Sequence, residues 1–153
     1  MKKTINIQNK KEAILGIQVF QTKQHTCDVR FINIHLKDLN ALVHKELFSK
    51  NDLFVEAGTL WDIMQPLGKV RAHHFHALTP TDIFETLQNI TQPYCILENA
   101  DGRIEILSSI KSHFGVPLIV NSGIITNDSA NINKMVTMFP KRNAGQYILK
   151  FEI

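Results

Sequence analysis

The sequence predicts an α+β fold in which helices are followed by a meander of antiparallel strands. Three observations predict it. Apolar residues recur at helical spacing near residue 40, a capped helix follows at about residue 80, and strand-like runs separated by turn signals fill the chain after Pro93. The chain has 153 residues, 44% of them hydrophobic, so we expect one compact domain with its own core.

The first third of the chain contains two strand-like runs and one amphipathic helix. The runs "AILGIQVF" and "VRFINIHL", within residues 13–36, are rich in β-branched residues and are predicted to pair as strands. The helix is predicted from apolar residues at three- and four-residue steps, which are Leu39, Leu42, Val43 and Leu47. In "GTLWDIMQPLG", Thr59 is the predicted cap of a short helix that ends at Pro66.

The stretch "ALTPTDIFETLQNI" has the clearest local signal and predicts a helix over residues 80–89. Thr79 is a suitable N-cap, and Pro80 fits the first helical position because the amide hydrogen that it lacks would have no helical partner there. Asp82 stands where the carboxylate of a capping box reaches back to the cap.

Residues 94–152 are predicted to form the antiparallel meander, with the helix at 80–89 packed on one of its faces. Strands 94–98 and 103–109 should pair through a turn at Asp101 and Gly102, because glycine accepts the positive φ of a tight turn. Further strands are expected in "VPLIVNSGI", "INKMVTMF" and "QYILKFEI".

Three histidines, His73, His74 and His76, precede the capped helix in "RAHHFHAL". Isolated histidines are often inert surface or core groups, which is one interpretation. A zinc site is a second, but zinc needs three or four ligands, and the chain has no HExxH or paired CxxC motif. The third is acid-base catalysis, because the pKa of an ordinary histidine is close to neutral.

Near the C-terminus, "NKMVTMFPKRN" has the composition of a strand with a cationic end. In a strand Thr137 and Phe139 project to one face, and Lys141 and Arg142 follow where long side chains can reach a bound anion. The alternative is a solvated basic strand end, since such pairs are common on surfaces. The net charge of +3 is too small to indicate nucleic-acid binding by itself.

The stretch from His76 to Asn143 resembles the C-terminal nuclease domains of phage and mobile-element proteins. These are the phage barnase, EndoU, colicin and RelE-like (PBECR) nucleases, which include the MuF C-terminal toxin domains. "HALTPTDIFETL" matches their histidine ahead of a helix, "QPYCILEN" their strand opened by proline, and "GVPLIV" a later strand. "NKMVTMFPK" matches their last signature, with Thr137 in place of the usual serine and Phe139 in place of the frequent tyrosine.

The resemblance implies helices packed on a curved antiparallel sheet, with residues 71–153 as the nuclease core. Residues 1–70 would be either the N-terminal part of the domain or a docking element. It implies a metal-independent ribonuclease without cofactors, in which a ribose 2′-hydroxyl attacks the adjacent phosphate. The implied catalytic residues are His76, His74, Thr137 and Lys141, and the implied substrate-binding residues are Arg142, Asn133 and Phe139.

The alternative function is a non-catalytic module that uses the same fold to bind RNA or a protein. Phe139 and the small net charge favour this alternative. The expected partners are RNA and an immunity or antitoxin protein. A cytoplasmic location is expected, because the N-terminus lacks a signal-peptide core, no run approaches ~20 apolar residues, and Cys27 and Cys95 have no paired framework.

Overall fold

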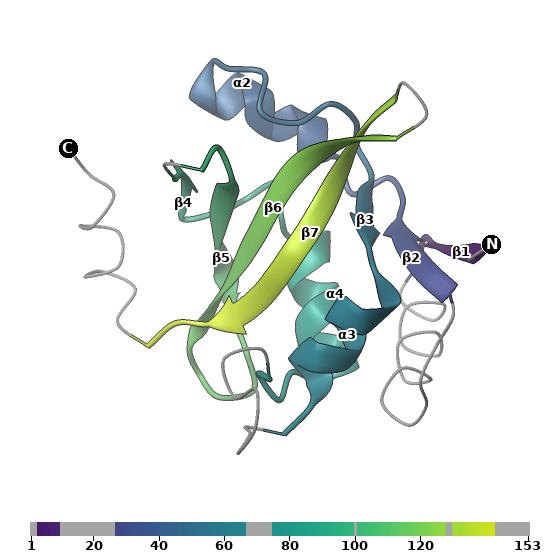
Figure 1. Cartoon of the computed structure of the whole chain (residues 1–153). Coiled ribbons are helices and arrows are strands. Elements are labelled where there is room, and N and C mark those ends of the chain that lie inside the picture. Colours follow the sequence, from purple (N-terminus) through teal and green to yellow (C-terminus); the bar gives the residue numbers. More distant parts are fainter. Residues whose placement is uncertain (1–2, 10–26, 67–74, 100, 128–129, 143–153) are drawn as a thin grey trace.

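The computed structural model describes residues 3–9, 27–66, 75–99, 101–127 and 130–142. They form one seven-stranded mixed sheet in the order β1-β2-β3-β7-β6-β5-β4, with short helices beside it (Figure 1). The strands are β1 (Lys3–Ile7), β2 (Cys27–Phe31), β3 (Leu53–Val55), β4 (Cys95–Glu98), β5 (Ile104–Lys111), β6 (Pro117–Asn127) and β7 (Ala130–Pro140). The helices are η1 (Leu36–Asp38), α2 (Leu39–Val43), α3 (Ala57–Met64) and α4 (Pro80–Gln88).

The prediction of helices packed on an antiparallel meander was wrong, because the sheet is mixed and includes the N-terminal part of the chain. β1 pairs with β2 in parallel, and β3 pairs in parallel with β7, through Phe54 and Lys134. β2 and β3 are antiparallel. These pairings join segments that are distant in the sequence, and a strand of three residues such as β3 shows no periodicity that could predict it.

The two elements with the strongest local signals, α4 and the β4–β5 hairpin, are confirmed. The Asp82 amide donates to the Thr79 hydroxyl at 3.0 Å, and the Thr79 amide donates to the Asp82 carboxylate at 3.0 Å, which is the predicted capping box. β4 and β5 are antiparallel, and Gly102 in the turn has a φ of 80°. β6 and β7 continue with antiparallel pairing. The predicted strands at 13–20 and 146–153 lie outside the described residues.

α3 begins two residues before the predicted cap, Thr59. Its N-cap residue, Glu56, makes no side-chain capping bond. Instead the Ala57 amide donates to the carboxylate of Asp28, a buried residue of β2, at 3.1 Å. A side chain 29 positions away therefore provides the hydrogen-bond acceptor for a backbone N–H group at the start of α3.

The predicted helix near residue 40 is shorter than its apolar pattern suggests. α2 ends at Val43, and His44 takes the left-handed conformation. The buried amide of Asn40 accepts from the backbone N–H groups of Leu47 and Phe48 at 2.8 and 2.9 Å. These side-chain bonds replace the helical ones and turn the chain toward β3.

The main core lies between α3, α4 and one face of the sheet. It contains Leu60, Ile83 and Leu87 from the helices and Ile106, Val120, Met135 and Met138 from the strands, all at most 1% exposed.

Candidate functional site

His76 lies in the short segment that leads into α4, and this segment is fixed to the end of α3. The Ala77 amide donates to the Gln65 carbonyl at 2.7 Å, and the Leu78 amide donates to the Ile63 carbonyl at 2.9 Å. Ala77 has a φ of 52°, a left-handed conformation that alanine adopts at a cost of about 1–2 kcal/mol. The backbone that holds His76 is thus both anchored and strained.

The His76 ring packs against Phe139 near the end of β7. The ring centroids are 5.9 Å apart and the planes are tilted by 41°. Both side chains are partly exposed. The segment before α4 and the last residues of β7, which are 63 positions apart in the sequence, therefore meet at one end of the sheet.

A β-bulge in β7 determines which residues share a face with Phe139. Ser122 pairs with Met135 and Asn121 pairs with Thr137, so Val136 is an extra residue without a partner. Met135 and Met138 consequently both reach the core, although they are three residues apart. Thr137, together with Phe139, lies on the face opposite the core.

The bulge separates Asn133 from Thr137, so the structure does not bring Asn133 to the His76 end of the sheet. Asn133 is 1% exposed. Its amide donates to the backbone carbonyls of Lys50 and Asp52 at 2.6 and 3.0 Å and accepts from the Ser49 amide at 3.0 Å. The Asn133 side chain therefore attaches the segment between α2 and β3 to strand β7.

We expect Asn133→Ala to lower the free energy of unfolding by about 2–4 kcal/mol. The substitution leaves one amide and two carbonyls without their partner, and each buried unpaired group costs about 1–3 kcal/mol. Denaturant unfolding measures the change. Lys50→Ala is the matched control, because it keeps the bonded backbone carbonyl and should change stability by less than about 0.5 kcal/mol. Equal stability of Asn133→Ala and the control would refute the structural role.

A polar row crosses three strands on the face that carries Thr137. Thr137 pairs with Asn121 and Asn121 with Glu105, and the Asn121 amide donates to the Glu105 carboxylate at 3.3 Å. Asn121 and Glu105 are 8% and 5% exposed. Within the described part of the chain, the Asn121 side-chain oxygen has no hydrogen-bond partner. A buried polar atom without a hydrogen-bond partner costs stability.

Lys141 and Arg142 continue the chain directly after β7. The Lys141 amide donates to the Pro117 carbonyl at 3.0 Å, which fixes the Lys141 backbone beside the start of β6. The Lys141 side chain is partly exposed and Arg142 is exposed. The structure thus places His76, Thr137, Phe139, Lys141 and Arg142 at one end of the sheet, and we call this set the candidate site. His73 and His74 lie outside the described residues.

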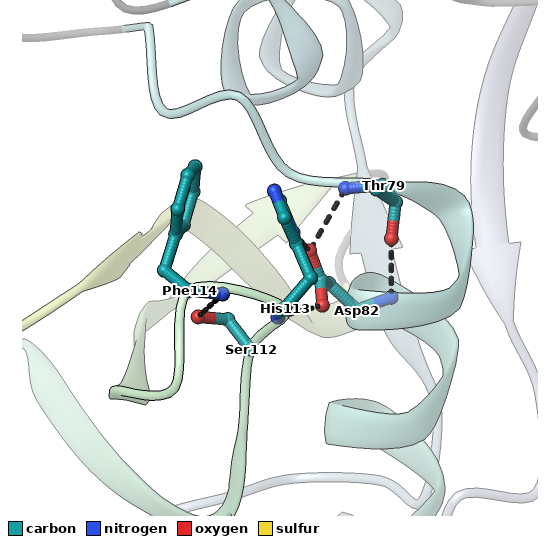
Figure 2. A network of polar contacts seen from close by, with 5 residues as sticks. All are labelled: Thr79, Asp82, Ser112, His113 and Phe114. Carbon is teal, nitrogen blue, oxygen red and sulfur yellow. Dashed lines mark hydrogen bonds and ion pairs between the residues drawn. The ribbon is translucent and has the colours of Figure 1, made fainter.

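A second histidine, His113, occupies the β5–β6 turn at this end of the sheet, and the sequence patterns gave no sign of it. Its Nδ1 lies 2.5 Å from the Asp82 Oδ2 atom, and its backbone amide donates to the Asp82 Oδ1 atom at 2.9 Å. Figure 2 shows the imidazole between the Phe114 ring and the Thr79 end of α4. Asp82, predicted only as a helix cap, therefore also holds a histidine. The sequence offers one indirect signal for the contact between His113 and Asp82: a buried capping carboxylate needs a chain segment that covers it.

The tight turn around His113 presents its side chain. The Gly115 amide donates to the Ser112 carbonyl at 2.8 Å, and the Ser112 amide donates to the Val116 carbonyl at 2.8 Å. Gly115 has a φ of 76°, which glycine accepts without a steric cost. The turn ends one residue before Pro117, the residue that binds the Lys141 amide.

A pocket of about 350 Å³ lies at the other end of α4. Phe31, Asn33, His35, Leu87 and Gln88 are among the residues that line it. No member of the candidate site does. The pocket is therefore separate from the residues that the sequence connects with chemistry.

Comparison of the chain with protein-family models, with curated proteins and with solved structures found no match. Within the described ranges, no three His, Cys, Asp or Glu side chains are grouped so that they could hold a metal ion. None of the helices that the structure describes has the length and apolar character needed to cross a membrane.

Proposed function

We propose that this protein is a metal-independent endoribonuclease that cleaves RNA through attack of a ribose 2′-hydroxyl on the adjacent phosphate. The observation that carries the proposal is the packing of the His76 ring on Phe139, on the sheet face that also presents Thr137. The reaction needs proton transfer and stabilisation of negative charge around one phosphorus atom. The candidate site offers an imidazole, a hydroxyl and two cations within one small region.

Each residue has a role in this proposal. His76 transfers a proton to or from a reacting oxygen, for which a partly exposed imidazole is suited. The Thr137 hydroxyl donates a hydrogen bond to a non-bridging phosphate oxygen, while Lys141 and Arg142 balance the charge that grows on the phosphate. The resemblance adds His74 as a second imidazole. We do not assign Asn133 to substrate binding, since its amide is bonded to the backbone at 50 and 52.

We also propose a cytoplasmic location and a protein partner. RNA is the substrate that the mechanism requires, and no disulfide joins Cys27 and Cys95, as is usual in a reducing compartment. A ribonuclease that cleaves cellular RNA without control would harm the cell that makes it. An immunity or antitoxin protein that covers the candidate site is therefore the expected partner.

Incubation of the protein with total RNA, with and without EDTA, tests the proposal. We expect cleavage in both samples, because none of the proposed roles requires a metal ion. Cleavage only without EDTA would indicate a metal-dependent enzyme and contradict the mechanism. RNA binding without cleavage in either sample would support the non-catalytic binding module instead.

A further inference from the structure

We infer that His113, oriented by Asp82, is the second proton-transfer group of the candidate site, in the place that the resemblance gives to His74. The inference rests on the proposed ribonuclease function. Cleavage by a 2′-hydroxyl needs one group that accepts the proton of the attacking hydroxyl and another that protonates the leaving oxygen. His76 supplies one of them, and the chain must supply the other within reach of the same phosphate.

The Asp82 carboxylate fixes the position of the His113 imidazole. Asp82 is 6% exposed and accepts the backbone amides of Thr79 and His113 as well as the ring Nδ1 atom. The Phe114 ring lies against the imidazole, with centroids 3.9 Å apart. Held by the carboxylate at Nδ1 and by an aromatic ring on its face, the imidazole has little freedom to rotate.

The other ring nitrogen of His113 remains available to a substrate. A carboxylate oxygen can only accept, so Nδ1 carries the hydrogen in this contact and Nε2 is left to exchange a proton. No residue in the described part of the chain hydrogen-bonds Nε2, and the side chain is 42% exposed. In Figure 2 the imidazole extends away from the Asp82 carboxylate. A carboxylate that holds one imidazole nitrogen while the other faces the reactants is a recurrent catalytic arrangement.

A role limited to joining α4 to the turn does not require an imidazole. The backbone amide of His113 already binds Asp82 at 2.9 Å, and any residue except proline could supply it. The capping box of α4 is likewise complete through Thr79 and Asp82 alone. The imidazole adds a partly exposed proton-transfer group to a connection that the backbone has already made.

His113 and His76 lie at the same end of the sheet. Thr79 binds Asp82, and Thr79 is only three positions from His76 in the chain, a distance of about 10 Å when fully extended. On its other side, the turn of His113 runs into Pro117, whose carbonyl holds the Lys141 amide. The contacts of His113 therefore connect it both to the segment that carries His76 and to the segment that carries Lys141.

The proposed step is balanced without a further reactant. One imidazole takes the proton of the 2′-hydroxyl while its oxygen forms a bond to phosphorus. The bond from phosphorus to the 5′-oxygen breaks, and the other imidazole, in its protonated form, gives that oxygen a proton. The products are a 2′,3′-cyclic phosphate and a 5′-hydroxyl, and proton exchange with water restores both rings.

The test compares kcat and KM for an RNA oligonucleotide among the wild type, His113→Asn, His113→Ala and Asp82→Asn. An asparagine amide can take the place of Nδ1 beside Asp82 but has no group equivalent to Nε2. We expect His113→Asn to keep its thermal stability and to lose about 10²-fold or more in kcat, with a smaller change in KM. Added imidazole should restore part of the activity of His113→Ala. His44→Asn, at an exposed histidine of left-handed conformation, is the matched control and should behave as the wild type.

The outcomes separate this inference from the proposed function. If the wild type cleaves RNA and folded His113→Asn cleaves it equally well, the inference is overturned while the proposed function stands. A folded His113→Ala that is slow but gains nothing from imidazole would assign His113 a structural role and also overturn the inference. If the wild type does not cleave RNA, both the proposed function and the inference about His113 are contradicted. Asp82→Asn should lower kcat less than His113→Asn, since Asp82 acts as a positioning residue.

Discussion

His76→Ala is expected to lower the rate of RNA cleavage by about 10²–10⁴-fold, the usual range for removal of a general acid or base. The imidazole is partly exposed and anchored through its backbone neighbours, so the change removes a reactive group with little effect on the core. Cleavage of a labelled RNA oligonucleotide under single-turnover conditions measures the rate. Thermal unfolding confirms that the variant remains folded.

His44→Asn is the control for this variant, because it removes an exposed histidine at the end of α2, on another part of the surface. Its cleavage rate should equal that of the wild type. If His76→Ala retains full activity, His76 has no part in the reaction, and its packing on Phe139 is only a surface contact.

Lys141→Ala is expected to lower the cleavage rate by about 10²–10³-fold, the loss seen when one preorganised stabiliser of transition-state charge is removed. The Lys141 amide is bonded to the Pro117 carbonyl. The side chain that carries the positive charge therefore starts from a fixed backbone position at the end of the sheet. Lys141→Arg keeps the charge and should recover part of the rate. Measured kcat and KM for the three proteins give the comparison.

Lys37→Ala is the control for charge, since it removes an exposed lysine from η1 and lowers the net charge by the same amount. It should cleave RNA nearly as fast as the wild type. Equal losses in Lys37→Ala and Lys141→Ala would mean that overall charge attracts RNA and that Lys141 has no special position.

Sequence signals predicted the structure where the deciding contacts are local. Thr79, Pro80 and Asp82 lie within four positions and specify the start of α4 by themselves. Gly102 likewise specifies the β4–β5 turn through its own backbone. In both cases the competing conformations are excluded by residues next to each other in the chain.

Distant contacts decided the elements that the sequence did not predict. α3 begins at Ala57 because Asp28 reaches it from β2, and no residue near Thr59 signals that contact. The mixed sheet arises because β3 pairs with β7, which lies more than 70 residues later. The position of a short strand in a sheet is decided by the strands that pair with it, so its own sequence predicts that position poorly.

In the candidate site, too, local patterns predicted some features and distant contacts decided the others. Strand alternation correctly put Thr137 and Phe139 on one face, but the bulge at Val136 moved Asn133 to the other. His113 was overlooked because "KSHFG" reads only as a break between strands, while its partner Asp82 had already been explained as a cap. A capping residue can carry a second function when a distant loop folds over it.

Cleavage of an oligonucleotide with a single ribose in an otherwise deoxyribose chain, in the presence of EDTA, tests the central claim most directly. Only the phosphate next to that ribose has a 2′-hydroxyl that can attack it. The proposed mechanism predicts one cut at this position, with a 2′,3′-cyclic phosphate on one product and a 5′-hydroxyl on the other. Cuts elsewhere in the oligonucleotide, or products with a 5′-phosphate, would contradict it.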